Sequence, residues 1–197
     1  MMQRKVTNPL ALAVLAELMV EPMHPYEIGR RLKGHDTDQS IKYNQGSLYM
    51  VVKQLTKAGF IASQETVRDT LRPERTVYAL TEKGRHELFD WLSDLVAQPV
   101  NDYPQFGVAL SLMSVLPPAE SVRLLTQRLE RLNTQAEQIR QSRQSAGNDG
   151  VLWVFLIDDD FRLALLEAER QFVTELIESF KQPAYMRAWQ ETLGSQA

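Results

Sequence analysis

The residues best suited to bind a ligand lie on one face of a predicted helix that follows Asn44. Lys53 and Lys57 fall on that face, and no carboxylate occurs anywhere from Asn44 to Gly59. The opposite face carries apolar residues at i, i+3, i+4 and i+7, which predicts burial of Leu48, Val51, Val52 and Leu55. Asn44 is a favourable N-cap and Gly59 a favourable C-terminal residue. A helix with a cationic, acid-free outer face suits an anionic partner.

A predicted β-hairpin follows this helix. Residues 61–67 and 75–81 read as strands, and the turn between them contains Arg68, Arg72 and Pro73. Helix, strand, basic turn and strand are the elements of a winged helix-turn-helix, whose helix enters the major groove while its wing reaches the flanking backbone. Arginine suits the tip of a wing because its planar guanidinium stays charged and can bond two phosphate oxygens. These elements therefore predict a DNA interface.

The sequence offers little for catalysis. The three histidines, His24, His35 and His86, lie far apart, and there is no H-E-x-x-H, Gly-rich phosphate loop or G-x-S-x-G motif. We therefore expect no enzyme, no cofactor and no metal site. Three aspartates at 158–160 precede a helix. They could hold a cation, but a helix cap with two further charges at the positive helix end is the simpler interpretation.

Composition limits the class of protein. The 197 residues include no cysteine, which excludes disulfides and fits a reducing cytoplasm. No apolar run approaches the 18 residues of a membrane span, and no signal peptide is expected, so the prediction is a cytoplasmic protein. The net charge is −3, but residues 1–80 carry +3 and residues 81–197 carry −6. The basic balance thus coincides with the predicted interface.

The elements around the interface predict two domains. A first helix begins at Asn8 and ends before Pro22, and a second follows Pro25. Arg30, Arg31 and Lys33 end the second helix, where they either compensate its dipole or contact phosphate. Thr81 caps a fourth helix, and residues 98–104 form a break with two prolines. We therefore expect a winged helix-turn-helix over residues 1–97 and a helical dimerisation domain over residues 98–197.

The second predicted domain contains an extended heptad pattern. A helix over residues 119–144 has apolar residues at alternating spacings of three and four, which is typical of a coiled-coil seam. Residues 145–150 read as a turn, and a helix with a wider apolar face follows residue 160. The predicted dimer seam comprises Val122, Leu125, Leu129, Leu132, Ala136, Ile139, Leu165, Phe172 and Leu176. The expected fold class is therefore mainly α with a small β-wing.

Three segments together resemble the PadR family of bacterial transcriptional regulators, in its longer form with an extended helical C-terminal region. They span residues 12–32, 46–61 and 75–88, about the first half of the chain. The shared motifs are Tyr26-Glu27-Ile28, Gly46-Ser47-Leu48-Tyr49, and Arg75 with Tyr78, Leu80, Thr81 and Gly84. The chain departs from the family at Met50, where proline is usual, and at Pro25, where glycine is common. Because Met50 lies on the predicted groove face, the family's base preferences cannot be carried over.

The resemblance implies a homodimer that binds a near-palindromic operator, most often as a repressor released by a small aromatic or drug-like molecule. The candidate DNA-binding residues are Lys42, Tyr43, Asn44, Gln45, Ser47, Tyr49, Lys53, Arg68, Arg72 and Arg75. The candidate effector pocket comprises Phe106, Met113, Trp153, Phe155 and Phe161, although ordinary core residues are the simpler interpretation. Two alternatives remain open: a winged helix used only for protein contacts, and a transcriptional activator of the same fold.

Overall fold

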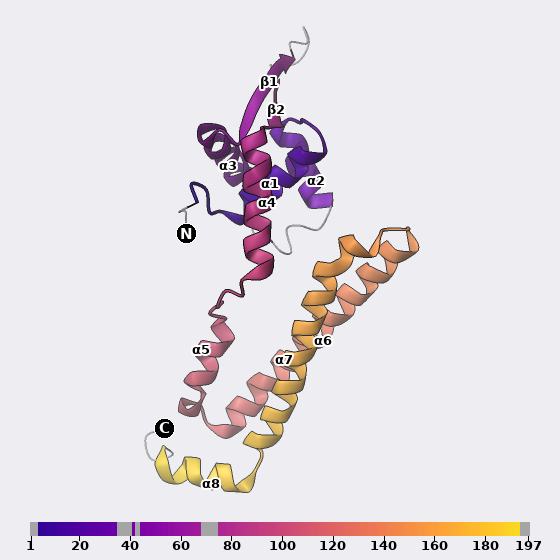
Figure 1. Ribbon diagram of the computed structural model, residues 1–197. Coiled ribbons are helices and arrows are strands. Elements are labelled where there is room, and N and C mark those ends of the chain that lie inside the picture. Colours follow the sequence, from indigo (N-terminus) through magenta and orange to yellow (C-terminus); the bar gives the residue numbers. More distant parts are fainter. Residues whose placement is uncertain (1–3, 35–40, 42–43, 68–74, 194–197) are drawn as a thin grey trace. The chain divides into compact units, whose positions relative to one another are not determined.

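The chain folds into two units, each with its own hydrophobic core. The computed structural model describes residues 4–34, 41, 44–67 and 75–193. The units are Met1–Asn101 and Asp102–Ala197, and residues 98–104 between them form neither helix nor strand. The first unit contains helices and a wing, and the second contains only helices in its described part (Figure 1).

The first unit begins with the three helices α1 (Pro9–Val20), α2 (Pro25–Gly34) and α3 (Gln45–Ala58). As predicted, the Asn8 side chain caps α1 by accepting a hydrogen bond of 3.0 Å from the Leu10 N–H. The helices share one core, in which the predicted α3 stripe is fully buried. The principal core residues are Leu10, Val14, Leu15, Ile28, Leu32, Leu48, Val51, Val52, Leu55 and Ile61.

The wing consists of β1 (Ile61–Val67) and β2 (Arg75–Leu80), which pair antiparallel from Ile61 opposite Leu80 to Val67 opposite Arg75. Met23 adds a short third segment, because its N–H and C=O both bond to Tyr78 at 3.0 Å. This pairing joins the start of α2 to the wing and was not predicted. The wing tip, with Arg68 and Arg72, lies outside the described residues.

Helix α4 (Glu82–Ala97) follows the wing directly. As predicted, Thr81 caps it by accepting a hydrogen bond from the Gly84 N–H at 3.0 Å. The segment before α1 is held against α4 by Arg4, whose guanidinium pairs with Asp94 and lies 5.6 Å from the centre of the Trp91 ring. The N-terminal segment, α1 and α4 thus form the support on which α2, α3 and the wing rest.

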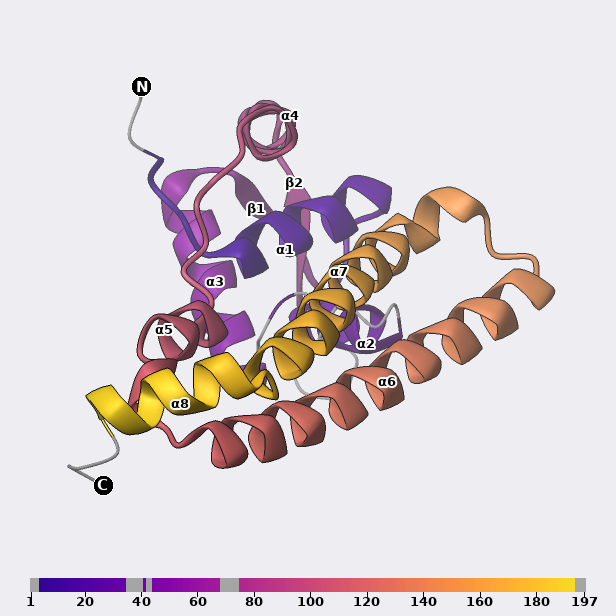
Figure 2. The ribbon, with the colours of Figure 1, turned by 90° about the horizontal axis from the view of Figure 1, so that it is seen from below.

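The second unit is built on two long helices, α6 (Pro118–Asn148) and α7 (Ile157–Phe180). They lie side by side in both ribbon views (Figures 1 and 2), and ion pairs such as Arg128–Glu169 and Arg140–Glu167 join them. The remaining elements are short: α5 (Gln105–Ser111), the 3₁₀ turns η2 (Met113–Val115) and η3 (Trp153–Leu156), and α8 (Pro183–Thr192). Within the described ranges, no helix has the length and hydropathy of a membrane span.

The structure corrects the expectation that the α6 seam faces a second chain. Leu125 and Leu132 pack against Val173, Ile177 and Phe180 of α7 in the same chain. Ala136 and Ile139 are also buried, while Val122 and Leu129 are partly buried against the same cluster. A heptad pattern predicts that one face of a helix packs against another helix. It does not predict whether that second helix belongs to the same chain or to another chain.

Two local predictions in the second unit are also wrong. Helix α6 continues to Asn148, through most of the predicted turn at 145–150. Helix α7 begins at Ile157, so the three aspartates lie inside its first turn and none of them caps it. Asp159 pairs with Arg162, and Asp160 pairs with Arg143 of α6. Their carboxylates therefore favour the positive helix end, and that of Asp160 also ties α7 to α6.

Candidate nucleic-acid interface

Helix α3 begins with a capping box formed by Asn44 and Ser47. The Ser47 N–H donates to Asn44 Oδ1 at 2.8 Å, and the Asn44 N–H donates to Ser47 Oγ at 2.9 Å. The Ser47 hydroxyl also donates to the Asn44 carbonyl oxygen at 2.7 Å. The predicted cap is confirmed, and Ser47, predicted only as a groove contact, holds the helix start. Gly59 ends the helix in the left-handed conformation, with φ of 76°, as predicted.

The outer face of α3 is exposed and carries no acidic side chain. Gln45, Lys53 and Lys57 are exposed, Tyr49 is 44% exposed and Met50 is 64% exposed. The buried stripe on the other side fixes the rotation of the helix, so these side chains project from the unit together. The face combines two ammonium groups with amide and phenol groups that can hydrogen-bond to phosphates or base edges.

The remaining predicted DNA contacts receive less structural support. Lys42, Tyr43, Arg68 and Arg72 lie outside the described residues, and Arg75 is described only through its backbone, which begins β2 opposite Val67. They remain predictions. The described part of the interface therefore rests on α3 and on the elements beside it.

The cations at the end of α2 divide into two groups. Arg31 forms an ion pair with Glu21, the residue that follows α1 in the same unit. Arg30, although paired with Glu27, lines a hollow between α2 and α3 together with Lys33 and Gln45. Arg31 thus forms an ion pair within the unit, whereas Arg30 and Lys33 border the candidate interface.

A second hollow lies on the wing side of α3. Its lining includes His24 from the start of α2, Lys53 and Lys57 from α3, and Thr76 from β2. His24 was not among the predicted site residues. No spacing in the sequence could have indicated it, because the Met23–Tyr78 pairing is what brings it beside α3 and β2.

The five candidate effector residues do not come together. Phe106 and Met113 pack with the α6–α7 core, and the Arg128 guanidinium lies 3.6 Å from the centre of the Phe106 ring. Trp153, Phe155 and Phe161 lie where α6 connects to α7 and are 72%, 68% and 63% exposed. Among the described residues, these three side chains lie outside the α6–α7 core.

The architecture described above is a winged helix-turn-helix fold, mainly helical with a two-stranded wing. Residues 12–90 match the Transcriptional regulator PadR-like family. The match covers 79 of the 197 residues, so the first unit is similar to this family of transcriptional regulators.

Among curated proteins, the chain is 26% identical to the Negative transcriptional regulator PadR of Bacillus subtilis (strain 168) over 133 residues. These residues make up 68% of this chain and 72% of that protein.

Solved structures share the fold. Bacillus subtilis PadR in complex with operator DNA has a TM-score of 0.73 and 20% identity, covering 88% of this chain and 100% of that chain. The same protein in complex with p-coumaric acid has a TM-score of 0.69 and 19% identity, covering 90% and 99%. The Vibrio cholerae virulence activator AphA has a TM-score of 0.66 and 17% identity, covering 86% and 96%.

Proposed function

We propose that this protein is a transcriptional regulator that binds operator DNA through the outer face of α3, with the wing contacting the flanking backbone. The observation that carries the proposal is an exposed, acid-free α3 face with Lys53 and Lys57, in a chain whose residues 12–90 match the PadR-like family. The operator complex of the Bacillus subtilis relative supports DNA as the partner.

We propose repression as the output, because the curated relative is a negative regulator. The alternative is activation, since the AphA structure shows that the same fold occurs in an activator. A promoter–reporter fusion in cells with and without the protein separates the two: repression predicts higher expression in its absence, and activation predicts lower expression.

We propose a homodimer held by α7. Four apolar residues, Phe161, Leu165, Ala168 and Phe172, recur at i, i+4, i+7 and i+11 on this helix and are exposed in the single chain. This α7 stripe is distinct from Val173 and Ile177, which face α6. Exposed apolar stripes of this kind mark interfaces, and a stripe on a long helix suits the same stripe of a second copy. Leu165 and Phe172 were predicted seam residues, so they remain candidates for the contact between chains.

We further propose that a small aromatic molecule lowers the DNA affinity of the protein. The support is the complex of the Bacillus subtilis relative with p-coumaric acid, together with the exposed Trp153, Phe155 and Phe161. A dimer that covers these side chains would enclose them in a pocket. Titrating p-coumaric acid into the protein–DNA complex, with benzoic acid as a smaller control, should release the DNA.

The experiment that tests DNA binding is a selection from random duplexes followed by fluorescence anisotropy at two salt concentrations. Lys53→Glu should weaken binding to the selected duplex about tenfold or more, because it replaces a cation that faces phosphates by an anion. Lys181→Glu, the same charge change on an exposed lysine of the second unit, is the matched control. If no duplex is preferred, or both variants bind equally well, the protein-interaction alternative takes precedence.

A further inference from the structure

One apolar side chain lies within the polar outer face of α3. Met50 is 64% exposed, whereas the apolar stripe on the opposite side of the helix is buried. It belongs to a strip whose members recur at i, i+4, i+7 and i+11: Gly46, Met50, Lys53 and Lys57. Because the buried stripe fixes the rotation of α3, Met50 projects from the unit on the same side as the two ammonium groups. Attraction of this face to phosphate accounts for the lysines and not for the thioether.

The position of Met50 along α3 suits contact with base edges. It lies in the N-terminal half of the helix, and the N-terminal residues of a recognition helix are those that reach bases in the major groove. A helical side chain leans toward the helix N-terminus, so that of Met50 covers the surface next to Gly46, which is exposed and has no side chain. The first turns of the strip therefore offer an apolar surface that a base can approach closely.

The chemistry of the major groove indicates what such a surface contacts. Beside its hydrogen-bonding groups, the groove presents one apolar group, the 5-methyl of thymine. Methionine is unbranched and has three rotatable bonds, so its terminal methyl and sulfur can adjust to the place of this group. Packing the two apolar groups together removes both from water, which is favourable.

We propose that Met50 packs against the 5-methyl group of a thymine in each operator half-site and thereby specifies a T·A pair at that position. This inference rests on the proposed function. It adds to that function a contact that carries sequence information, which contacts between lysine and phosphate do not.

The decisive experiment removes the methyl group from the DNA. A duplex selected by the wild-type protein is synthesised with deoxyuridine, which lacks only the 5-methyl, in place of each thymidine of a half-site in turn. At one position the wild-type protein should lose about fourfold in affinity, the effect of one methyl group returned to water. Met50→Ala, already weaker, should lose less than about twofold there. If the exchange costs both proteins the same at every position, Met50 contacts no thymine methyl and the proposal is overturned.

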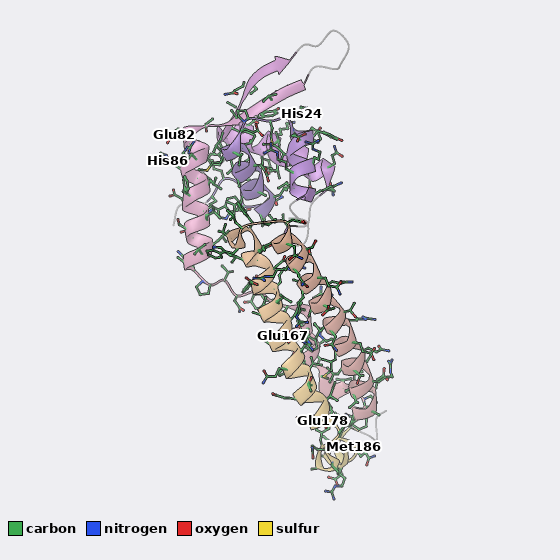
Figure 3. All side chains as sticks on the ribbon, turned by 90° about the vertical axis from the view of Figure 1, so that its right-hand side faces the viewer. His24, Glu82, His86, Glu167, Glu178 and Met186 are labelled. Atoms are coloured by element: carbon green, nitrogen blue, oxygen red, sulfur yellow. The ribbon has the colours of Figure 1, made fainter. Side chains whose placement is uncertain are left out.

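Three further variants test whether an apolar side chain is what matters. Met50→Leu keeps an apolar side chain of similar volume and should retain most of the discrimination between thymidine and deoxyuridine. Met50→Gln replaces the thioether by an amide and should lose the discrimination, so wild-type discrimination in this variant would overturn the proposal. Met186→Ala is the matched control, because Met186 is 41% exposed on α8 of the second unit (Figure 3). It should bind and discriminate as the wild type does.

The contact can also be observed directly by nuclear magnetic resonance. With the methionine ε-methyl groups labelled with ¹³C, the resonance that is missing from Met50→Ala belongs to Met50. In the complex it should show a nuclear Overhauser effect to the thymine methyl identified by the deoxyuridine exchange. If this effect is absent, the methyl dependence of binding arises without contact from Met50, and the proposal is overturned.

Failure of this inference and failure of the proposed function have different outcomes. A selected duplex whose binding falls with Lys53→Glu, but does not depend on any thymine methyl, would retain the DNA-binding regulator and remove the role of Met50. A selection that yields no preferred duplex would overturn both.

Discussion

At the scale of single residues, Gly84 shows how one missing side chain determines a packing distance. A Cβ atom at this position would lie 2.0 Å from the Phe60 carbonyl oxygen and 2.8 Å from its carbon. Helix α4 therefore approaches the start of β1 more closely than any other residue type permits. The Thr81 hydroxyl reinforces this approach by donating to the Gly59 carbonyl oxygen at 2.8 Å.

Replacing Gly84 by alanine should destabilise the first unit. The methyl group would collide with backbone that cannot move without displacing β1, so we expect the free energy of unfolding to fall by about 1–3 kcal/mol or more. Urea unfolding followed by circular dichroism measures this change. Gly147→Ala in α6 is the control: no atom lies within 4 Å of the added Cβ, and the better helix propensity should add up to ~1 kcal/mol. Equal stability of the two variants would contradict the close approach.

At the scale of elements, the second unit depends on the contact between α6 and α7. Leu125 is 1% exposed and Val173 is fully buried at this contact, and the Arg–Glu pairs at its margins are partly exposed. Exposed ion pairs contribute little to stability, whereas buried leucine and valine side chains contribute substantially. The buried apolar side chains between α6 and α7 therefore supply most of the free energy that holds these two helices together.

Truncating a buried side chain between α6 and α7 should destabilise the second unit. This effect should not depend on association with a second chain. Leu132→Ala removes a side chain that is 5% exposed and should lower the free energy of unfolding by about 2–5 kcal/mol. Gln135→Ala, an exposed neighbour on α6, should change it by less than about 0.5 kcal/mol. Differential scanning calorimetry in a Phe172→Glu background, where association is disfavoured, tests the intrachain assignment. A Leu132→Ala effect that disappears in this background would return the seam to an interface between chains.

At the scale of the whole molecule, the proposed homodimer would determine how operator DNA is bound. Two copies with two-fold symmetry would present two α3 helices, which would match a near-palindromic site. The α7 stripe of Phe161, Leu165, Ala168 and Phe172 is the described surface that we assign to this contact. Each copy alone would neutralise fewer phosphates and bind the operator more weakly.

Phe172→Glu should therefore separate the copies, because it places a charge in an apolar contact between helices. Analytical ultracentrifugation at micromolar concentration should give about twice the chain mass of 22.6 kDa for the wild type and about the chain mass for the variant. Thr174→Glu, which adds the same charge at an exposed position of α7 off the stripe, should remain a dimer. A wild-type monomer would remove the basis for palindromic recognition, and a dimeric Phe172→Glu variant would exclude the α7 stripe as the contact.

Features that depend on neighbouring residues were predictable from the sequence. Asn44, Gly59 and Thr81 determine helix ends because a cap acts on N–H or C=O groups a few residues away. The buried stripe of α3 was predictable for the same reason, since helical periodicity alone places its members on one face. Once the buried stripe was placed, the sequence also predicted the acid-free face on the opposite side of α3, which forms part of the candidate interface.

Only the tertiary structure decided which surfaces meet. The heptad pattern of α6 was evident, but its partner proved to be α7 of the same chain, because periodicity shows that a stripe is covered and not by which helix. His24 became part of the candidate interface only when Met23 paired with Tyr78, a contact between residues distant in sequence. Local sequence thus determined the elements and their faces, whereas long-range pairing and packing decided which side chains share a site.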